Sequence, residues 1–166
     1  QRFPVDDRGE LDFFLGVAVT RDRAARTLSI SQSLYVTDII DRFGSHIAAG
    51  HTRRFDTPME EGLHLSHDDS PAEGTAAAQQ MSSRRADYMS IVGAFLWLAN
   101  MSRHEISHVS SQLSRFVSNP GPTHFNAMLR VLIYLNGTKS RRLEFKPKAE
   151  LPLHVLVDSS WDSKFS

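Results

Sequence analysis

Asp158 is the residue whose type and position point most directly to chemistry. It follows an apolar segment, residues 153–157, that predicts a strand, with Pro152 at the strand entrance, where proline is tolerated. A carboxylate at the end of a buried strand is held rigidly and is suited to binding a divalent cation. Two-metal hydrolysis needs further carboxylates to share the ions, so we do not expect Asp158 to be catalytic in this chain alone. The alternative is an aspartate that caps a turn.

A second group of candidates lies in a predicted β-hairpin over residues 11–31. Apolar residues alternate with others over residues 11–19, which predicts a strand with one buried face, and residues 27–30 predict the return strand. Phe14 falls between the apolar positions, so we expect it to face outward, where a ring can pack on a base or sugar. The nucleic-acid-binding candidates of this hairpin are Phe14, Leu15, Gly16, Arg21 and Arg23.

These candidates also have structural interpretations. Gly16 lacks a Cβ and lets a sugar-phosphate backbone approach, but it can equally mark a bulge, with Phe14 packed on neighbouring helices. Arg21, Arg23 and Arg26 occupy a polar turn, where such side chains either contact phosphates or only face water. The sequence leaves both interpretations open.

Composition limits the function classes. The 166 residues include 19 basic and 19 acidic side chains, and this balance argues against a free-standing nucleic-acid-binding protein, which would be basic. The absence of cysteine excludes disulfides, thiolate zinc sites and cysteine nucleophiles. No apolar stretch is long enough to span a bilayer. The first residues resemble neither an initiator methionine nor a signal peptide, so we expect a fragment.

Helices are expected to position these candidates. Apolar residues recur at helical spacing within residues 36–43, 88–99, 106–117 and 125–135. Ser31 or Ser33 can cap the first helix, and Gly44 can end it in a left-handed C-cap.

Two features of the later helices carry further expectations. Gly93 costs about 1 kcal/mol relative to alanine inside a helix, so we expect it to mark close approach of a neighbour. Ser102 and Glu105 have the spacing of a capping box.

Between the first and second helices, residues 45–83 show no hydrophobic period and predict a long loop or a linker between two halves. The histidines in this stretch match no metal-ligand spacing. Residues 143–145 and 153–157 predict two closing strands. The expected fold class is α+β, with an N-terminal hairpin, a middle of about four helices and a C-terminal strand pair.

Several short motifs span nearly the whole chain. They are GELDFFLGV at residues 9–17, SQSLY at 31–35, TPM at 57–59, YMSIVGAFLWLAN at 88–100, SQLSRFVSNP at 111–120, His124 followed by RVLIYLNGTK at 130–139, and VDSSW at 157–161. In this order and spacing they resemble the C-terminal part of copia-type LTR retrotransposon reverse transcriptases. Each motif alone is weak, whereas the ordered set is specific.

The resemblance implies a parent Pol polyprotein that has RNA-directed DNA polymerase and RNase H activities and also carries protease and integrase parts. It implies that residues 1–31 end the palm with the primer-grip hairpin, that residues 32–140 form thumb and connection helices, and that residues 141–166 begin a truncated RNase H-like domain. Asp158 would be the first RNase H metal ligand. Mg²⁺ would serve the intact enzyme, with no cofactor expected for this chain alone.

The resemblance also implies partners. They are an RNA–DNA or DNA primer-template and the remainder of the polyprotein, without a membrane, in an intracellular compartment that the sequence does not specify. The adjacent pair Asp6 and Asp7 imitates the polymerase carboxylates, but Pro4 stands where the family has an aromatic residue, so we interpret the pair as a solvated turn. His104 and Glu105 replace the family's proline and aspartate, which indicates a divergent or decaying copy rather than a new site.

The same sequence is compatible with two other functions. The chain could be a non-catalytic remnant or a helical interaction module with no enzymatic role. An unrelated helical binding domain is a third class, and the ordered motifs argue against it.

Overall fold

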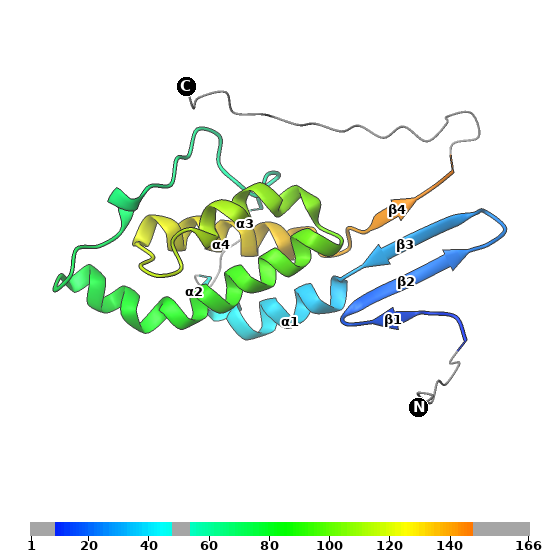
Figure 1. Ribbon diagram of the computed structural model, residues 1–166, viewed down its shortest axis with the longest axis horizontal. Helices are drawn as coiled ribbons and strands as arrows, with labels where there is room; N and C mark the ends of the chain where they lie inside the picture. The colour runs from blue at the N-terminus through cyan, green and yellow to red at the C-terminus, as the bar shows by residue number, and fades with distance from the viewer. Residues whose placement is uncertain (1–8, 48–53, 148–166) are drawn as a thin grey trace, which may run out of the picture.

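The computed structural model describes residues 9–47 and 54–147, in which a helical bundle is continued at one end by an antiparallel sheet (Figure 1). The described part is a mixed α and β structure with four α-helices and one four-stranded sheet, as the sequence predicts in outline. The elements are β1 (Phe13–Phe14), β2 (Val17–Asp22), β3 (Thr27–Ser31), α1 (Ser33–Phe43), α2 (Ala76–Met101), α3 (Ser107–Ser114), α4 (Pro122–Gly137) and β4 (Leu143–Phe145), with short 3₁₀ turns η1 (Gly44–His46), η2 (His67–Asp69) and η3 (His104–Ile106).

The predicted continuous strand over residues 11–19 is wrong, because the chain reverses direction at Leu15 and Gly16. Both residues have positive φ, 49° and 81°, and Phe14 pairs with Val17 across them. Two positive φ angles in a two-residue connection are typical of the turns that join twisted antiparallel strands. Gly16 is therefore a turn residue rather than a bulge.

Strand β4 joins the sheet at its other edge, which the sequence does not predict. It pairs antiparallel with β3, with Leu143 opposite Ile30 and Phe145 opposite Leu28. The sheet order is β1-β2-β3-β4. The second predicted strand of the C-terminal pair, residues 153–157, lies outside the described residues.

Helix α1 buries Val36, Ile39 and Phe43, as its periodicity predicts. Its caps differ from the expectation. Gln32 occupies the N-cap position without a side-chain capping bond, although the Ser31 hydroxyl accepts a hydrogen bond from the Ser33 N–H at 3.3 Å. Gly44 has φ −62°, in the right-handed region. The left-handed C-cap does not form because the chain tightens directly into the 3₁₀ turn η1.

Helix α2 begins earlier than expected, so the predicted loop over residues 45–83 is too long at its C-terminal end. Thr75 caps the helix by accepting a hydrogen bond from the Ala78 N–H at 3.2 Å. A run of alanine and glutamine follows, and these residues favour helix without contributing an apolar face. Hydrophobic periodicity therefore gave no sign of the first part of α2.

The predicted capping box at Ser102 and Glu105 is wrong. Ser102 ends α2 as its C-cap, and the 3₁₀ turn that follows has no side-chain cap. Glu105 is instead bonded to Arg103, whose Nε donates to Glu105 Oε1 at 2.7 Å.

The core lies between the helices and confirms the predicted apolar faces. Its fully buried members include Tyr88, Phe95, Ile106, Leu113, Met128 and Leu132. Tyr88 also donates a hydrogen bond from its hydroxyl to the Leu113 carbonyl at 2.9 Å, and burial raises the pKa of this phenol. None of the helices in the described residues has the length and apolarity needed to cross a membrane.

Candidate nucleic-acid interface

The strand register assigns each side chain of the sheet to one of two faces, because directly paired residues share a face. Phe14 pairs with Val17, Val19 with Ile30, and Leu28 with Phe145. One face, which we call the apolar sheet face, therefore carries Phe14, Val17, Val19, Leu28, Ile30, Leu143 and Phe145. The expectation that Phe14 faces away from the apolar set is wrong, because the turn at residues 15–16 returns Phe14 to the face of Val17.

Large apolar side chains remain exposed around this face. Leu15 is 66% exposed, Phe14 59% and Phe145 51%. In the described part of the chain Phe14 is mostly exposed, which argues against packing on the helices, one interpretation of its position. No sequence pattern places Phe145 here, because only the pairing of β4 with β3 brings it to this face.

Leu15 is in an unfavourable backbone conformation. A non-glycine residue in the left-handed region costs about 1 kcal/mol, and Leu15 has φ 49°. Its side chain is also mostly exposed, so the described fold gains little from a leucine at this position. A strained and exposed leucine is an outlier that favours a role in contacting another molecule.

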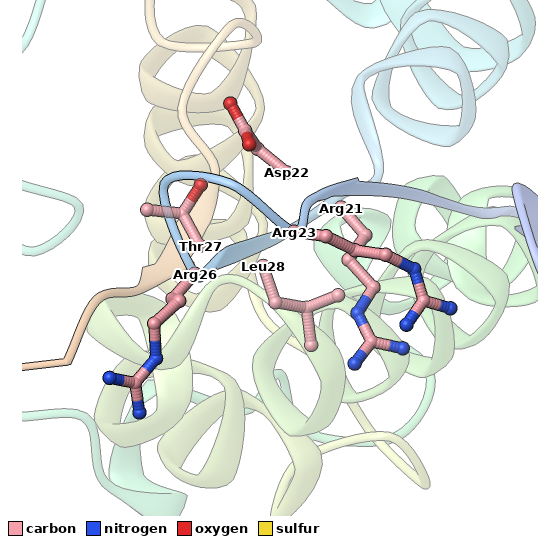
Figure 2. A pocket seen from close by; sticks show the side chains of 6 residues that line it. All are labelled: Arg21, Asp22, Arg23, Arg26, Thr27 and Leu28. Carbon is pink, nitrogen blue, oxygen red and sulfur yellow. The ribbon is translucent and has the colours of Figure 1, made fainter.

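The arginines predicted to contact phosphates gather at the other end of the sheet. Arg21, Arg23 and Arg26 line a surface hollow at the β2–β3 turn together with Asp22, Thr27 and Leu28 (Figure 2). Figure 2 shows that Arg21 and Arg23 extend to one side of the strand and Asp22 to the other. Arg21 lies opposite Leu28, on the apolar sheet face.

Arg23 is the least available of these cations. Its Nε donates to Glu10 Oε1 at 2.8 Å, and its Nη2 makes a second bond to the same oxygen. These hydrogen bonds and the charge of Arg23 lower the pKa of the Glu10 carboxyl. Arg21 and Arg26 have neither a hydrogen bond nor an ion pair within the described ranges.

The structure does not bring the five nucleic-acid-binding candidates together at one point. Leu15 and Gly16 lie at the end of the sheet beside the bundle, whereas the arginines lie at its far end (Figure 1). Strand β2 separates them by about 17 Å, at about 3.3 Å per residue. This length equals about five base pairs of a duplex at 3.4 Å each. An extended polymer suits such a face better than a small molecule.

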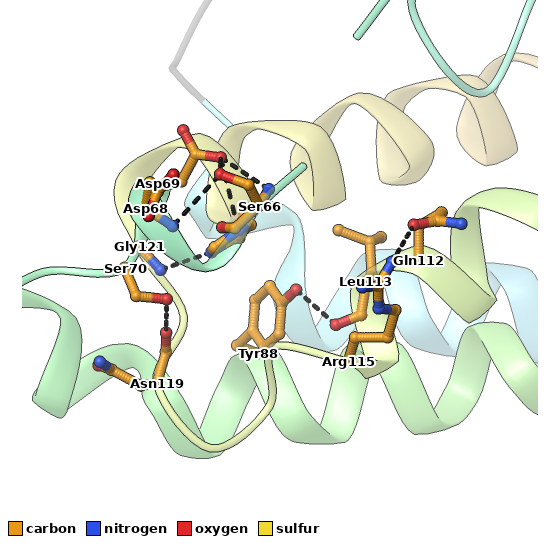
Figure 3. Close-up of polar contacts among 11 residues, drawn as sticks. Ser66, Asp68, Asp69, Ser70, Tyr88, Gln112, Leu113, Arg115, Asn119 and Gly121 are labelled. Atoms are coloured by element: carbon orange, nitrogen blue, oxygen red, sulfur yellow. Dashed lines mark hydrogen bonds and ion pairs between the residues drawn. The ribbon is translucent and has the colours of Figure 1, made fainter. Parts of the chain in front are cut away.

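At the opposite end of the bundle, buried His124 fastens the long loop to the start of α4, between Ser66 and Gly121, which are labelled in Figure 3. His124 Nδ1 accepts from the Gly121 N–H at 2.9 Å, and Nε2 lies 3.0 Å from the Ser66 carbonyl, so the neutral tautomer carries its proton on Nε2. The ring stacks on Phe116 at 3.9 Å between centroids. Burial is the main reason why the pKa of His124 is lowered. The geometry identifies a structural histidine.

Stability should therefore decrease as the pH falls below the ordinary histidine pKa. In the unfolded chain His124 binds a proton near pH 6.5, whereas the folded chain resists protonation. Its contribution is fully present above that pH and is lost as the pH falls through the lowered pKa of the folded chain. Urea unfolding at a series of pH values measures this slope. His124→Asn should flatten it, whereas the exposed His108→Asn should leave it unchanged. An unchanged slope in His124→Asn would contradict the assignment.

Helix α2 has an apolar outer face in addition to its buried one. Met89, Gly93 and Leu96 lie on this face and are exposed, and residues 88–102 contain no charged side chain. Nothing in the described part of the chain would contact a Cβ added to Gly93 within 4 Å, so the expected close neighbour of Gly93 is wrong. A helix that is apolar on both sides is the signal that could have indicated a second contact surface.

The described residues contain no candidate metal site. Over residues 9–47 and 54–147, no three His, Asp or Glu side chains form a group that could hold a metal ion. Asp158 lies outside the described residues, as do Asp6 and Asp7.

The chain is similar to Pol polyproteins of plant transposons. It is 31% identical over 82% of its length to the retrovirus-related Pol polyprotein from transposon TNT 1-94 of Nicotiana tabacum. It is 33% and 30% identical, each over 97% of its length, to those from transposons RE1 and RE2 of Arabidopsis thaliana. The chain spans only about 10% of the length of each relative. None of the protein-family models matches the chain, and no solved structure matches it significantly.

Proposed function

We propose that this chain is the segment of a retrotransposon Pol polyprotein that grips the primer-template of an RNA-directed DNA polymerase. The similarity to Pol polyproteins supports its place in such a protein. The observation that carries the grip is the exposed and strained Leu15 beside Phe14, on a sheet whose far end carries Arg21 on the same face. Apolar side chains would pack on sugars and bases at one end, and arginines would contact phosphates at the other.

Catalysis would belong to other parts of the polyprotein. In this proposal the chain lacks the polymerase aspartate pair. Asp158 would contribute one carboxylate to a Mg²⁺ site of an RNase H domain, and further carboxylates outside this chain would complete it. Residues 1–31, 32–140 and 141–166 keep the palm, thumb and RNase H assignments that the resemblance implies, within an intracellular polyprotein.

The Leu15→Asn variant tests the grip, because it should stabilise the fold and weaken the binding of primer-template. Asn-Gly is the pair preferred where both turn residues have positive φ, so the free energy of unfolding should rise by about 1 kcal/mol. The affinity for a labelled RNA–DNA primer-template should fall about fivefold, the factor that corresponds to about 1 kcal/mol of lost base or sugar contact. Urea unfolding and fluorescence anisotropy at low salt measure the two effects.

Leu34→Asn is the matched control. Leu34 is as exposed as Leu15, at 67%, but lies on α1 and not on the sheet. Its substitution should leave the affinity unchanged. If Leu15→Asn binds as tightly as the parent chain, or if the parent chain binds no primer-template, the proposed grip is wrong.

A helical interaction module is the second candidate, and the outer face of α2 favours it. Met89 and Leu96 are exposed on either side of Gly93, where a neighbouring backbone could approach closely. This candidate is supported over the first if the parent chain binds no primer-template while Met89→Glu abolishes binding to the rest of the polyprotein.

A further inference from the structure

Within the described residues, the chain passes between the sheet and the helical bundle at two places. Gln32 is the single residue between β3 and α1, and residues 138–142 connect α4 with β4. Figure 1 shows both connections at the end of the bundle from which the sheet extends. The orientation of the sheet depends on how these two connections are held.

Both connections are hydrogen-bonded to consecutive residues at the end of α2. The Ser102 hydroxyl donates to Gln32 Oε1 at 2.7 Å, and both side chains are buried. The Arg103 guanidinium donates from Nη2 to Thr138 Oγ1 at 2.6 Å, and Thr138 is the C-cap residue of α4. Arg103 itself is only 1% exposed.

Little apolar packing assists these bonds. The core cluster consists of helix and loop residues, and no strand residue belongs to it in the part of the chain that the structure describes. Val17 is the sheet residue that is most deeply buried among those described. A sheet without a shared core is free to change its angle unless directional bonds hold it, because apolar contacts impose little orientation.

The buried polar groups of these two connections are unfavourable for folding, so stability does not explain why they are present. Among the described residues, Gln32 Nε2 and Arg103 Nη1 are buried without a hydrogen-bond partner, and each such group is unfavourable. An apolar cluster of the same volume would often be equally stable or more so. Buried polar groups retained at such a cost favour a role in fixing one geometry.

We propose that Gln32, Ser102, Arg103 and Thr138 form a joint that fixes the direction in which the sheet leaves the bundle. The joint consists of positioning residues, because none of them lies on the apolar sheet face. Its consequence for nucleic-acid binding rests on the proposed grip: the joint holds the Leu15 turn and Arg21 in one arrangement relative to the helices. The claim that these residues fix the direction of the sheet does not depend on the grip.

Double electron–electron resonance on the full chain tests the joint directly. The chain has no cysteine, so Ala24→Cys at the hairpin tip and Ala86→Cys on α2 supply the only two labelling positions. With the joint intact, the distribution of distances between the labels should be narrow. Ser102→Ala or Gln32→Ala should broaden it about twofold, because a hinge that loses its directional contacts samples a range of angles.

Ser90→Ala is the matched control, since the Ser90 hydroxyl donates a hydrogen bond within its own helix, to the Ala86 carbonyl. This control should keep the narrow distribution. Circular dichroism confirms that each variant is folded, and Arg103→Lys, which keeps the charge but loses the planar fork, replaces any variant that is not. Unchanged distributions in all folded joint variants would overturn the proposal.

Primer-template affinity separates the joint from the proposed function. If the grip is correct, the joint variants should bind about fivefold more weakly while Ser90→Ala binds normally, a factor equivalent to about one net hydrogen bond. Broadened distance distributions in a chain that binds no primer-template would support the joint and reject the grip. Narrow distributions in variants that bind more weakly would reject the joint.

Discussion

The Gly121→Ala variant should lose about 3 kcal/mol of unfolding free energy, at the upper end of the usual range for overpacking. A Cβ at Gly121 would lie 1.8 Å from the Asp69 carbonyl oxygen and 2.8 Å from its carbonyl carbon. Both are backbone atoms, so neither can move aside by rotation of a side chain. Gly121 has φ −96° and ψ 174°, which alanine adopts freely, so the substitution tests packing and not backbone strain.

Relief of this contact requires separation of two segments that are fastened to each other. His124 binds the Gly121 N–H and lies within 3.0 Å of the Ser66 carbonyl, and the Ser70 hydroxyl donates to the Asn119 carbonyl at 2.8 Å (Figure 3). Ser66 and Asp69 are themselves joined through the Ser66 N–H, which donates to Asp69 Oδ2 at 2.9 Å. We expect the alanine to detach the η2 segment from α4 rather than to be absorbed locally.

Gly93→Ala is the matched control for Gly121→Ala. It has the same chemistry, but the added Cβ meets nothing within 4 Å in the described residues, and the position is inside α2. Its unfolding free energy should rise by about 1 kcal/mol, the helix preference of alanine over glycine. Urea unfolding of the two variants measures the contrast. Equal stabilities would show that the close approach at Gly121 is not rigid.

The difference between the two glycines also shows what the sequence could and could not predict. Gly93 stands inside an apolar period, so the helix was correctly expected, but the tight neighbour was assigned to the wrong glycine. The contact of Gly121 with Asp69 joins residues that are separated in the sequence by α2 and α3, and no local pattern indicates it. Periodicity reports which face of an element is buried, and not how closely two backbones approach.

Hydrophobic periodicity was limited in the same way in predicting the sheet. Alternation correctly placed Val17 and Val19 on one face, but it continued without interruption through Leu15 and Gly16, where the chain turns. Leucine is unfavourable at a positive φ, so the turn has only its glycine as a sequence signal. Phe13 and Phe14 were therefore each predicted on the wrong face of the sheet. The joint was missed entirely, because Gln32 and Ser102 are 70 positions apart.

Glu105 and Arg103 form an ion pair whose two partners should respond unequally to removal. The Arg103 side chain is 2% exposed and the Glu105 side chain 34%. Glu105→Ala leaves a buried guanidinium with Thr138 as its hydrogen-bond partner, and an uncompensated buried charge is strongly destabilising. We expect a loss of about 3 kcal/mol of unfolding free energy.

Arg103→Met should cost about half as much by the same reasoning. It leaves the Glu105 carboxylate, which retains contact with water and lies 3.4 Å from the Tyr134 hydroxyl, and a methionine fills part of the vacated volume. The burial of a charge, and not its pairing alone, therefore decides which substitution is worse. Chemical denaturation of both single variants and the double variant measures the order and the coupling between the residues. If Arg103→Met proves the more damaging change, the stability comes from the packing of the arginine and not from compensation of its charge.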